Sequence, residues 1–292
     1  MKSLWPIIFI SAISMALILP LILHNKNNSE VLGVVSSTIV QESAYDRIIS
    51  SKKIRCGYVN YGPGSIKNPT TGEIEGIAVD VIKSAANQLG FVIEWVEETT
   101  WGLHLEGLKT GRYDVLCSSS FALPSDALWS ETVGPLYYST IGVWVRGDDR
   151  RFINNYEAMN RNSIKIAAID GTIPFILAKK QFPEATIVSQ PQFTDYSLNM
   201  LNVLNGKADV TFVEAWQGNA FSAQNSNKLV NIGLEKPLRT YHNYMLVRKG
   251  EFKLQTMLNT VIEQMHHNNE IEQIISRYEG IKGSLLRVKK PY

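Results

Sequence analysis

Apolar and polar positions follow two repeated rhythms along the chain, and the first lies between residues 54 and 120. Its order is strand, helix, strand, helix, strand, over residues 54–59, 80–89, 91–96, 101–108 and a last strand that Asp114 begins. The first helix has an apolar face made of Val81, Ile82, Ala85, Ala86 and Leu89. This alternation predicts an α/β protein with a parallel sheet.

The second rhythm occupies residues 164–213. Strands are expected at 164–169, 186–189 and 210–213, with helices from Pro174 to about Lys180 and over 195–205. Farther on, a strand at 244–247 precedes a helix with apolar positions at Leu254, Met257, Leu258, Val261, Ile262 and Met265. We expect this last helix to pack back on the first half of the chain.

Each rhythm contains the same junction, in which Gly-x-x-Asp follows a helix and opens a strand. The two copies are Gly111 to Asp114 and Gly206 to Asp209. Each glycine stands where a helix ends in a left-handed residue, which glycine adopts without a steric penalty. The repeat predicts two similar lobes with a binding cleft between them, and we expect both aspartates to be structural.

Composition and charge exclude some classes of binding partner for the chain. The sequence has 29 Lys and Arg against 27 Asp and Glu, and no basic stripe of the kind that binds nucleic acid. No Cys-x-x-Cys spacing is present, and the adjacent His266 and His267 cannot face one metal on a helix. We therefore expect neither nucleic acid nor a metal or cofactor.

The N-terminus predicts a membrane segment. Residues 4–23 carry no charge and at helical rise would span roughly 30 Å, the thickness of the bilayer core. Residues 1–23 are expected to be an uncleaved anchor or a cleaved signal peptide, and residues 24–44, rich in Asn and Ser, a linker.

Several motifs in order resemble one protein family, the family 3 extracellular solute-binding proteins of the polar-amino-acid type. They are Gly76-Ile77-Ala78-Val79-Asp80, Leu89-Gly90, Trp101, Leu108 to Asp114, Pro135-Leu136-Tyr137-Tyr138, Gly171-Thr172 and Gly206 to Asp209. The resemblance runs from about Ile54 to Tyr278 and implies a type II periplasmic-binding fold. In such a fold ligands bind beyond the carboxyl ends of the strands, between the lobes.

The resemblance also implies lobe bounds and partners. Lobe 1 would comprise residues 45–139 and 239–280, lobe 2 residues 140–238, and residues 281–292 a tail, with hinge crossings near 137–139 and 239–243. The lobes would close on a small polar solute, an amino acid or related amine, on the extracytoplasmic face of a bacterial membrane. An ABC transporter permease would then receive the solute.

Aromatic candidates for ligand contact follow two strands of lobe 1. Tyr58 and Tyr61 follow the first strand and Trp101 the second, where the family places aromatic rings against the ligand. A ligand cation over such a ring gains roughly 0.5–2 kcal/mol. Packing beneath the loops is the alternative for each ring.

Polar candidates lie at strand ends in both lobes. Ser118, Ser119 and Ser120 follow the third strand, while Asp170 and Thr172 lie at a turn before a helix, whose N-terminus favours an anion. Ordinary strand ends and a helix cap are the alternatives. Glu214 closes the strand at 210–213, where the family usually has an Asp that receives the ligand's amino group.

One departure from the family bears on the ligand. Amino-acid binders of this type carry an Arg after the third strand, which holds the ligand carboxylate. Here the matching stretch reads Ala122 to Asp126, and no Lys or Arg occurs between Arg112 and Arg146. With Asp126, Asp170 and Glu214 as possible neighbours, we expect an amine-bearing or otherwise cationic solute.

Other possibilities stay open from the sequence. Cys56 and Cys117 lie on neighbouring strands and could form a disulfide or remain two buried thiols. A dehydratase of the same fold could use Glu214 as a general acid, although no catalytic triad or metal spacing accompanies it. A membrane-tethered sensory or docking module is a further alternative.

Overall fold

The computed structural model describes residues 42–192 and 194–289. The predicted anchor at 1–23 and all but the end of the predicted linker at 24–44 lie outside these residues. Within them, no helix has the length and apolar character needed to cross a bilayer.

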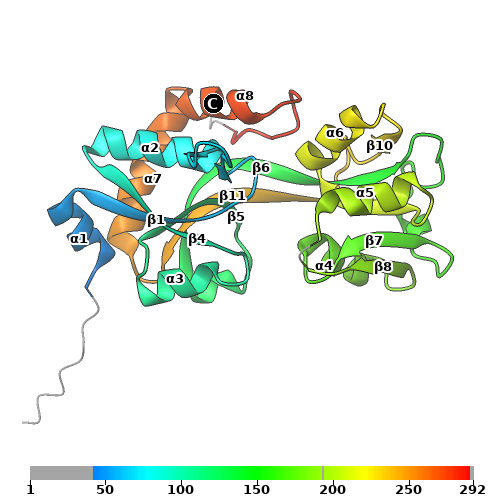
Figure 1. The fold of residues 1–292 in the computed structure, drawn as a ribbon, viewed down its shortest axis with the longest axis horizontal. Helices are drawn as coiled ribbons and strands as arrows, with labels where there is room; N and C mark the ends of the chain where they lie inside the picture. Colours follow the sequence, from blue (N-terminus) through cyan, green and yellow to red (C-terminus); the bar gives the residue numbers. More distant parts are fainter. Residues whose placement is uncertain (1–41, 193, 290–292) are drawn as a thin grey trace, which may run out of the picture. The chain divides into compact units, whose positions relative to one another are not determined.

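A nine-stranded mixed sheet organises the described residues (Figure 1). Its strands run in the order β4 (Val92–Thr99), β1 (Lys53–Val59), β5 (Val115–Phe121), β11 (Arg239–Arg248), β6 (Ser130–Arg146), β9 (Val210–Glu214), β7 (Lys165–Ile169) and β8 (Thr186–Gln190). Strand β10 (Leu229–Asn231) pairs with β6, and β2 (Ile66–Lys67) pairs with β3 (Ile74–Glu75) in a separate hairpin. As predicted, β1 is parallel to β4 and β5, and β7 is parallel to β8 and β9.

The first lobe packs helices on both faces of β1 and β5. On one face lie α1 (Ala44–Ser51), α2 (Ile77–Leu89), α7 (Phe252–His267) and α8 (Glu270–Tyr278), which share a large apolar core with the two strands. On the other face α3 (His104–Thr110) packs through Leu108 against Leu116 and Leu246. The predicted packing of the 254–265 helix on this lobe is confirmed.

The open question about the two cysteines is resolved by the structure. Cys56 of β1 and Cys117 of β5 are fully buried, their Cα atoms are 5.6 Å apart, and they form a disulfide. The bond joins two neighbouring strands on the core face that α2 covers.

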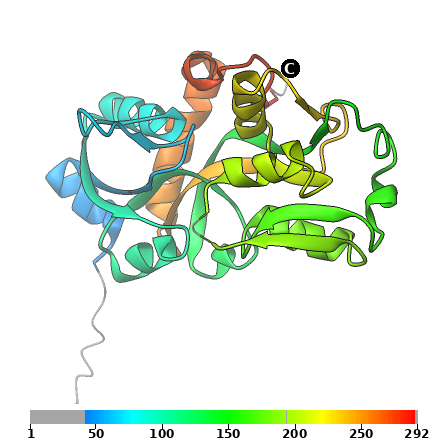
Figure 2. The same ribbon diagram turned by 45° about the vertical axis from the view of Figure 1, so that its right-hand side comes forward.

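The second lobe is built the same way on β7, β8 and β9. Figures 1 and 2 show α4 (Ile173–Gln181) on one side of these strands and α5 (Tyr196–Leu204) on the other. Helix α6 (Ala215–Gln224) follows β9 directly, and the short helices η1 (Asp126–Leu128) and η2 (Tyr156–Met159) lie in connections. Successive residues of β9 alternate between the two faces, with Phe212 in the α4 core and Val213 in the α5 core.

Strands β6 and β11 run side by side from one lobe to the other (Figure 1). They pair antiparallel, and the register places Tyr137, Tyr138 and Ser139 opposite Asn243, His242 and Tyr241. Both predicted hinge crossings therefore lie in one two-stranded ribbon. The buried side-chain amide of Asn243 donates to the Ser139 hydroxyl at 2.9 Å, which links the two crossings.

The repeated Gly-x-x-Asp junction has the same geometry in both lobes. Gly111 and Gly206 have φ angles of 69° and 70°, the left-handed region predicted for them. Each aspartate then binds the backbone of the neighbouring strand twice. Asp114 donates its N–H to the Arg55 carbonyl at 2.9 Å and accepts the Arg55 N–H at 3.0 Å. Asp209 does the same with Lys165, both distances being 2.8 Å.

Two predicted helix starts are wrong by three residues. Helix α2 begins at Ile77 rather than Asp80, because the backbone carbonyls of Pro63 and Gly64 accept its first two N–H groups and replace a capping side chain. Helix α3 begins at His104 rather than Trp101, since residues 101–103 form a turn that the Thr100 carbonyl closes.

Other elements are not predicted by the sequence pattern, or are predicted only in part. Residues 239–243 of β11 are polar or aromatic, so only its apolar end at 244–247 was predicted. Strand β6 contains Gly134 and Pro135, which normally interrupt strands. Helices α1, α6 and α8 were not assigned.

The junction gives a test of the fold. The Asp114 side chain is 1% exposed and forms ion pairs with Arg47 and Arg55, whereas that of Asp209 is 19% exposed and pairs with the half-exposed Arg151. Asp114→Asn is expected to lower the free energy of unfolding by roughly 1.5–3 kcal/mol. The matched Asp209→Asn is expected to cost about 0–1 kcal/mol. Urea denaturation measures both, and equal costs would contradict this account.

Candidate ligand-binding site

The carboxylate of Glu214 is the centre of the candidate site. The residue ends β9, at the carboxyl end of that strand, and is 6% exposed. The Tyr61 hydroxyl donates to its Oε1 at 2.7 Å, and the Trp216 indole N–H donates to its Oε2 at 3.2 Å. The Ser139 side chain is a further polar neighbour, which acts to lower the pKa of the carboxylate.

These three side chains come from three different parts of the chain. Tyr61 follows β1, Ser139 belongs to the hinge strand β6, and Trp216 lies in the first turn of α6. Asn243 of β11 donates to Ser139, so both hinge strands connect to Glu214. One carboxylate therefore joins lobe 1, lobe 2 and the hinge.

Burial sets the protonation of this group. Removal from water raises the pKa of Glu214 above its usual value of 4.5, and the hydrogen bonds from Tyr61, Ser139 and Trp216 oppose that rise. The pKa of Tyr61 is raised well above 10.0 by burial and then by the nearby Glu214 charge. The tyrosine therefore keeps its proton and remains a donor.

Aromatic rings surround the Tyr61–Glu214 contact. The Tyr61 ring lies edge-on to Trp101, Tyr196 and Trp216, with centroid separations of 5.8, 6.2 and 6.1 Å. Trp101 is 36% exposed and also meets the His104 ring edge-on. The site thus combines one buried negative charge with four rings, the groups that favour a cation.

The structure brings together Tyr61, Trp101 and Glu214 of the predicted site residues. Tyr58 is not with them, because its side chain packs with Ile74 and Val79 and its hydroxyl donates to Glu98 at 2.9 Å. Tyr58 lies within β1, whereas Tyr61 lies beyond its end, in a loop closed by backbone hydrogen bonds with Ser65, which accounts for the separation.

The three predicted serines are buried at the end of β5. Ser118 accepts the Val59 N–H at 2.8 Å and meets the Ser65 hydroxyl at 2.6 Å, so it supports the loop that carries Tyr61. Ser119 lies against Gly64, where a β-carbon would stand 2.4 Å from its Oγ. Ser120 contacts its own neighbouring carbonyl, that of Phe121, at 3.3 Å.

Asp170 and Thr172 have local partners at the start of α4. Asp170 is exposed and accepts a hydrogen bond from Ser189. Thr172 caps α4: its side chain accepts the Phe175 N–H at 3.4 Å and its hydroxyl donates to the Ile169 carbonyl at 2.7 Å. Among residues 42–192 and 194–289, neither residue shares a hydrogen bond or ion pair with Glu214. Both stay predictions as ligand contacts.

Sequence reasoning missed Tyr196, Trp216 and Ser139. Trp216 could have been predicted, because ligands of this fold bind beyond the carboxyl ends of strands and Trp216 lies two residues after Glu214, at the start of α6. Tyr196 begins α5 and Ser139 lies inside a hinge strand, and neither position follows an apolar strand in the sequence. Only the folded chain places them.

Asp126, considered as a neighbour of the ligand, is buried on the far side of Trp101. Its carboxylate lies 3.9 Å from Nε2 of His104, and Nδ1 of the same ring contacts the Trp101 carbonyl at 2.6 Å. Since a carbonyl only accepts, Nδ1 carries a proton. Asp126 is therefore connected to the turn that holds Trp101 through His104.

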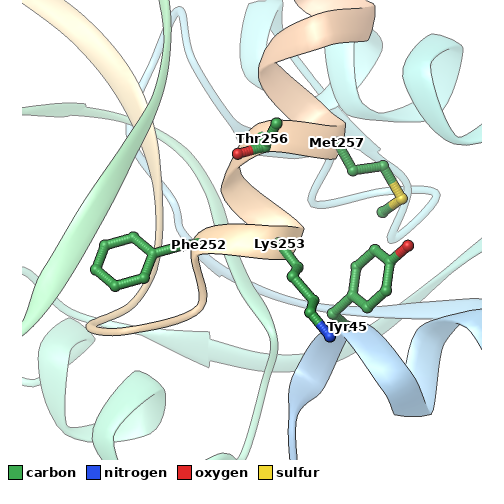
Figure 3. Close-up of a pocket in the computed structure, with 5 residues that line it drawn as sticks. All are labelled: Tyr45, Phe252, Lys253, Thr256 and Met257. Carbon is green, nitrogen blue, oxygen red and sulfur yellow. The ribbon is translucent and has the colours of Figure 1, made fainter.

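A surface pocket lies away from this site, between α1 and α7 (Figure 3). Tyr45, Phe252, Lys253, Thr256 and Met257 line it. Over residues 42–192 and 194–289, no group of three or more His, Cys, Asp or Glu side chains is arranged to hold a metal ion.

The buried carboxylate gives a prediction about pH. A folded-state pKa above 4.5 means that Glu214 favours folding at low pH and that this contribution is lost as pH rises through the raised pKa. Compared with Glu214→Gln, the wild-type chain is therefore expected to lose free energy of unfolding as pH rises above 4.5. Chemical denaturation from pH 4 to 8 measures the difference, and a difference that stays constant or grows in favour of wild type would contradict the shift.

Comparisons with known proteins agree with this architecture. The family model of bacterial extracellular solute-binding proteins, family 3, matches residues 54–281. The chain is 24% identical over 237 residues to the "probable amino-acid ABC transporter-binding protein" of Haemophilus influenzae, covering 80% of this chain and 88% of that protein.

Solved structures share the fold. A proposed binding component of an ABC transporter from Wolinella succinogenes, complexed with lysine, has a TM-score of 0.68 at 22% identity and covers 80% of this chain and 97% of its own. The ancestral amino acid-binding protein AncCDT-1, described as a precursor of cyclohexadienyl dehydratase, has a TM-score of 0.65 at 24% identity, covering 81% and 99%. With the family match spanning most of the sequence, the chain belongs to the bacterial extracellular solute-binding proteins of family 3.

Proposed function

We propose that this protein binds a small polar solute with a protonated amine and that Glu214 is the partner of the amine. The observation that carries the proposal is the buried carboxylate at the carboxyl end of β9, ringed by Tyr61, Trp101, Tyr196 and Trp216. A charge-assisted hydrogen bond to such a carboxylate contributes roughly 1.5–3 kcal/mol. The relatives named for lysine and amino acids support the same solute class.

The solute need not be a standard α-amino acid. No Lys or Arg occurs between Arg112 and Arg146, where the family's carboxylate-binding Arg would stand. The matching stretch holds Asp126, which is buried beside His104 and adds negative charge behind Trp101. A diamine, polyamine or other cationic solute fits this charge pattern better than an acidic amino acid does.

We propose binding without catalysis. The groups that donate hydrogen bonds to Glu214 are the Tyr61 hydroxyl and the Trp216 indole, and the Ser139 hydroxyl is a further polar neighbour. A raised carboxyl pKa would suit a general acid, but a dehydratase also needs a base or a positioned leaving group. The named contacts supply neither.

We also propose that the protein works on the extracytoplasmic face of a bacterial membrane and delivers its solute to an ABC transporter permease. The uncharged segment at residues 4–23 would tether or export it. Residues 45–139 with 239–280 and residues 140–238 would move as two lobes about β6 and β11. The separate apolar cores of the two lobes support this division.

Ligand screening tests the proposed solute class. The purified full chain is expected to gain thermal stability with lysine, arginine, putrescine or spermidine, because each can place an ammonium or guanidinium on Glu214. Glu214→Gln is expected to weaken binding of the active compound about 10- to 150-fold, the equivalent of one charge-assisted hydrogen bond. Isothermal titration calorimetry measures the loss.

Glu184→Gln is the matched control, since Glu184 is an exposed carboxylate between α4 and β8 of the same lobe. This variant is expected to bind the active compound as wild type does. Stabilisation by glutamate and aspartate alone, unchanged in Glu214→Gln, would refute the amine proposal. Turnover of prephenate or arogenate would refute binding without catalysis.

A further inference from the structure

Both oxygens of the Glu214 carboxylate are covered by the protein itself. Tyr61 donates to Oε1 and Trp216 donates to Oε2. The residue is only 6% exposed. A ligand ammonium that approaches Oε1 therefore has to enter where the Tyr61 hydroxyl lies, and one that approaches Oε2 has to enter where the Trp216 indole lies.

The side chains of Trp216 and Ser139 are held beside the Glu214 carboxylate by the packing around them. Trp216 lies two residues from Glu214 at the start of α6 and packs against the lobe 1 core. Ser139 is buried in β6, where Asn243 holds its hydroxyl at 2.9 Å. Both belong to elements that fix their side chains beside the carboxylate.

Tyr61 reaches Glu214 from the other lobe, through a loop of five residues. The loop is closed by two backbone hydrogen bonds between Tyr61 and Ser65, at 2.7 and 3.1 Å, and Ser65 is tied to Val59 and Ser118. The Tyr61 ring lies among Trp101, Tyr196 and Trp216. The loop thus delivers a phenol hydroxyl to the same oxygen that a ligand cation would use.

We propose that Tyr61 is an internal competitor for the amine site: its hydroxyl occupies Glu214 and a ligand with N–H donors has to displace it. The inference rests on the proposed function. It treats the Tyr61 hydroxyl as a group that opposes binding of an amine, rather than as one that hydrogen-bonds to the ligand. It makes Tyr61 a determinant of specificity. Methylated ammonium groups, which bring few or no N–H donors, bind against the rings without displacing the hydroxyl.

A conservative substitution separates the two roles. Tyr61→Phe keeps the ring, and with it the cation–π surface, but removes the competing hydroxyl. The expected result is about 10- to 150-fold tighter binding of putrescine, the equivalent of one hydrogen bond to a charged group. The bis(trimethylammonium) analogue of putrescine, which has no N–H donor, is expected to bind Tyr61→Phe and wild type equally.

Tyr278→Phe is the matched control. Its hydroxyl donates to the Asp80 carboxylate at 2.9 Å, so it is also a tyrosine–carboxylate pair, but it joins α8 to α2 within lobe 1. This variant is expected to bind putrescine as wild type does. Calorimetry on the full chain carrying each substitution measures all the affinities, and circular dichroism reports folding.

The outcomes separate this inference from the proposed function. Weaker or unchanged putrescine binding by folded Tyr61→Phe overturns the competition, and the amine proposal stands if Glu214→Gln still weakens binding as expected. Binding that appears only in Tyr61→Phe supports the competition directly. If putrescine binds neither wild type nor Tyr61→Phe, the competition is also overturned, and the compounds found by thermal screening decide the proposed function.

Discussion

One buried negative charge constrains this molecule more than any other single group. Taking the Glu214 carboxylate out of water is unfavourable unless hydrogen bonds compensate it. The chain supplies those bonds through the loop after β1 and the start of α6, and Ser139 of the hinge strand β6 is a further polar neighbour of the carboxylate. Because these groups belong to both lobes and to the hinge, the arrangement of these parts and the state of the carboxylate are coupled.

The scaffold that brings these donors together is itself repeated. In each lobe a glycine in the left-handed region ends a helix, and an aspartate three residues later fixes the next strand against its neighbour by the same pair of backbone contacts. The two copies differ in charge burial, since two arginines cover Asp114 while Asp209 has one half-exposed partner. The repeat therefore sets strand positions, and the strand ends carry the chemistry.

The sequence predicted the sheet, the two lobes and the position of Glu214, because apolar periodicity and glycine punctuation are local signals. It did not separate Tyr58 from Tyr61, since the end of β1 at Val59 and the loop that turns Tyr61 toward Glu214 depend on tertiary contacts. It also gave no sign that Ser118 supports a loop or that Tyr196 approaches Tyr61. Helix α2 began early for a similar reason: distant carbonyls, rather than Asp80, cap it.

The central claim is that a buried carboxylate selects a protonated amine. Mass spectrometry of the small molecule that the purified full chain carries tests it most directly, with wild type and Glu214→Gln prepared side by side. The account predicts a bound amine or guanidinium compound in wild type that is absent from Glu214→Gln. A neutral or anionic solute retained equally by both proteins would contradict it.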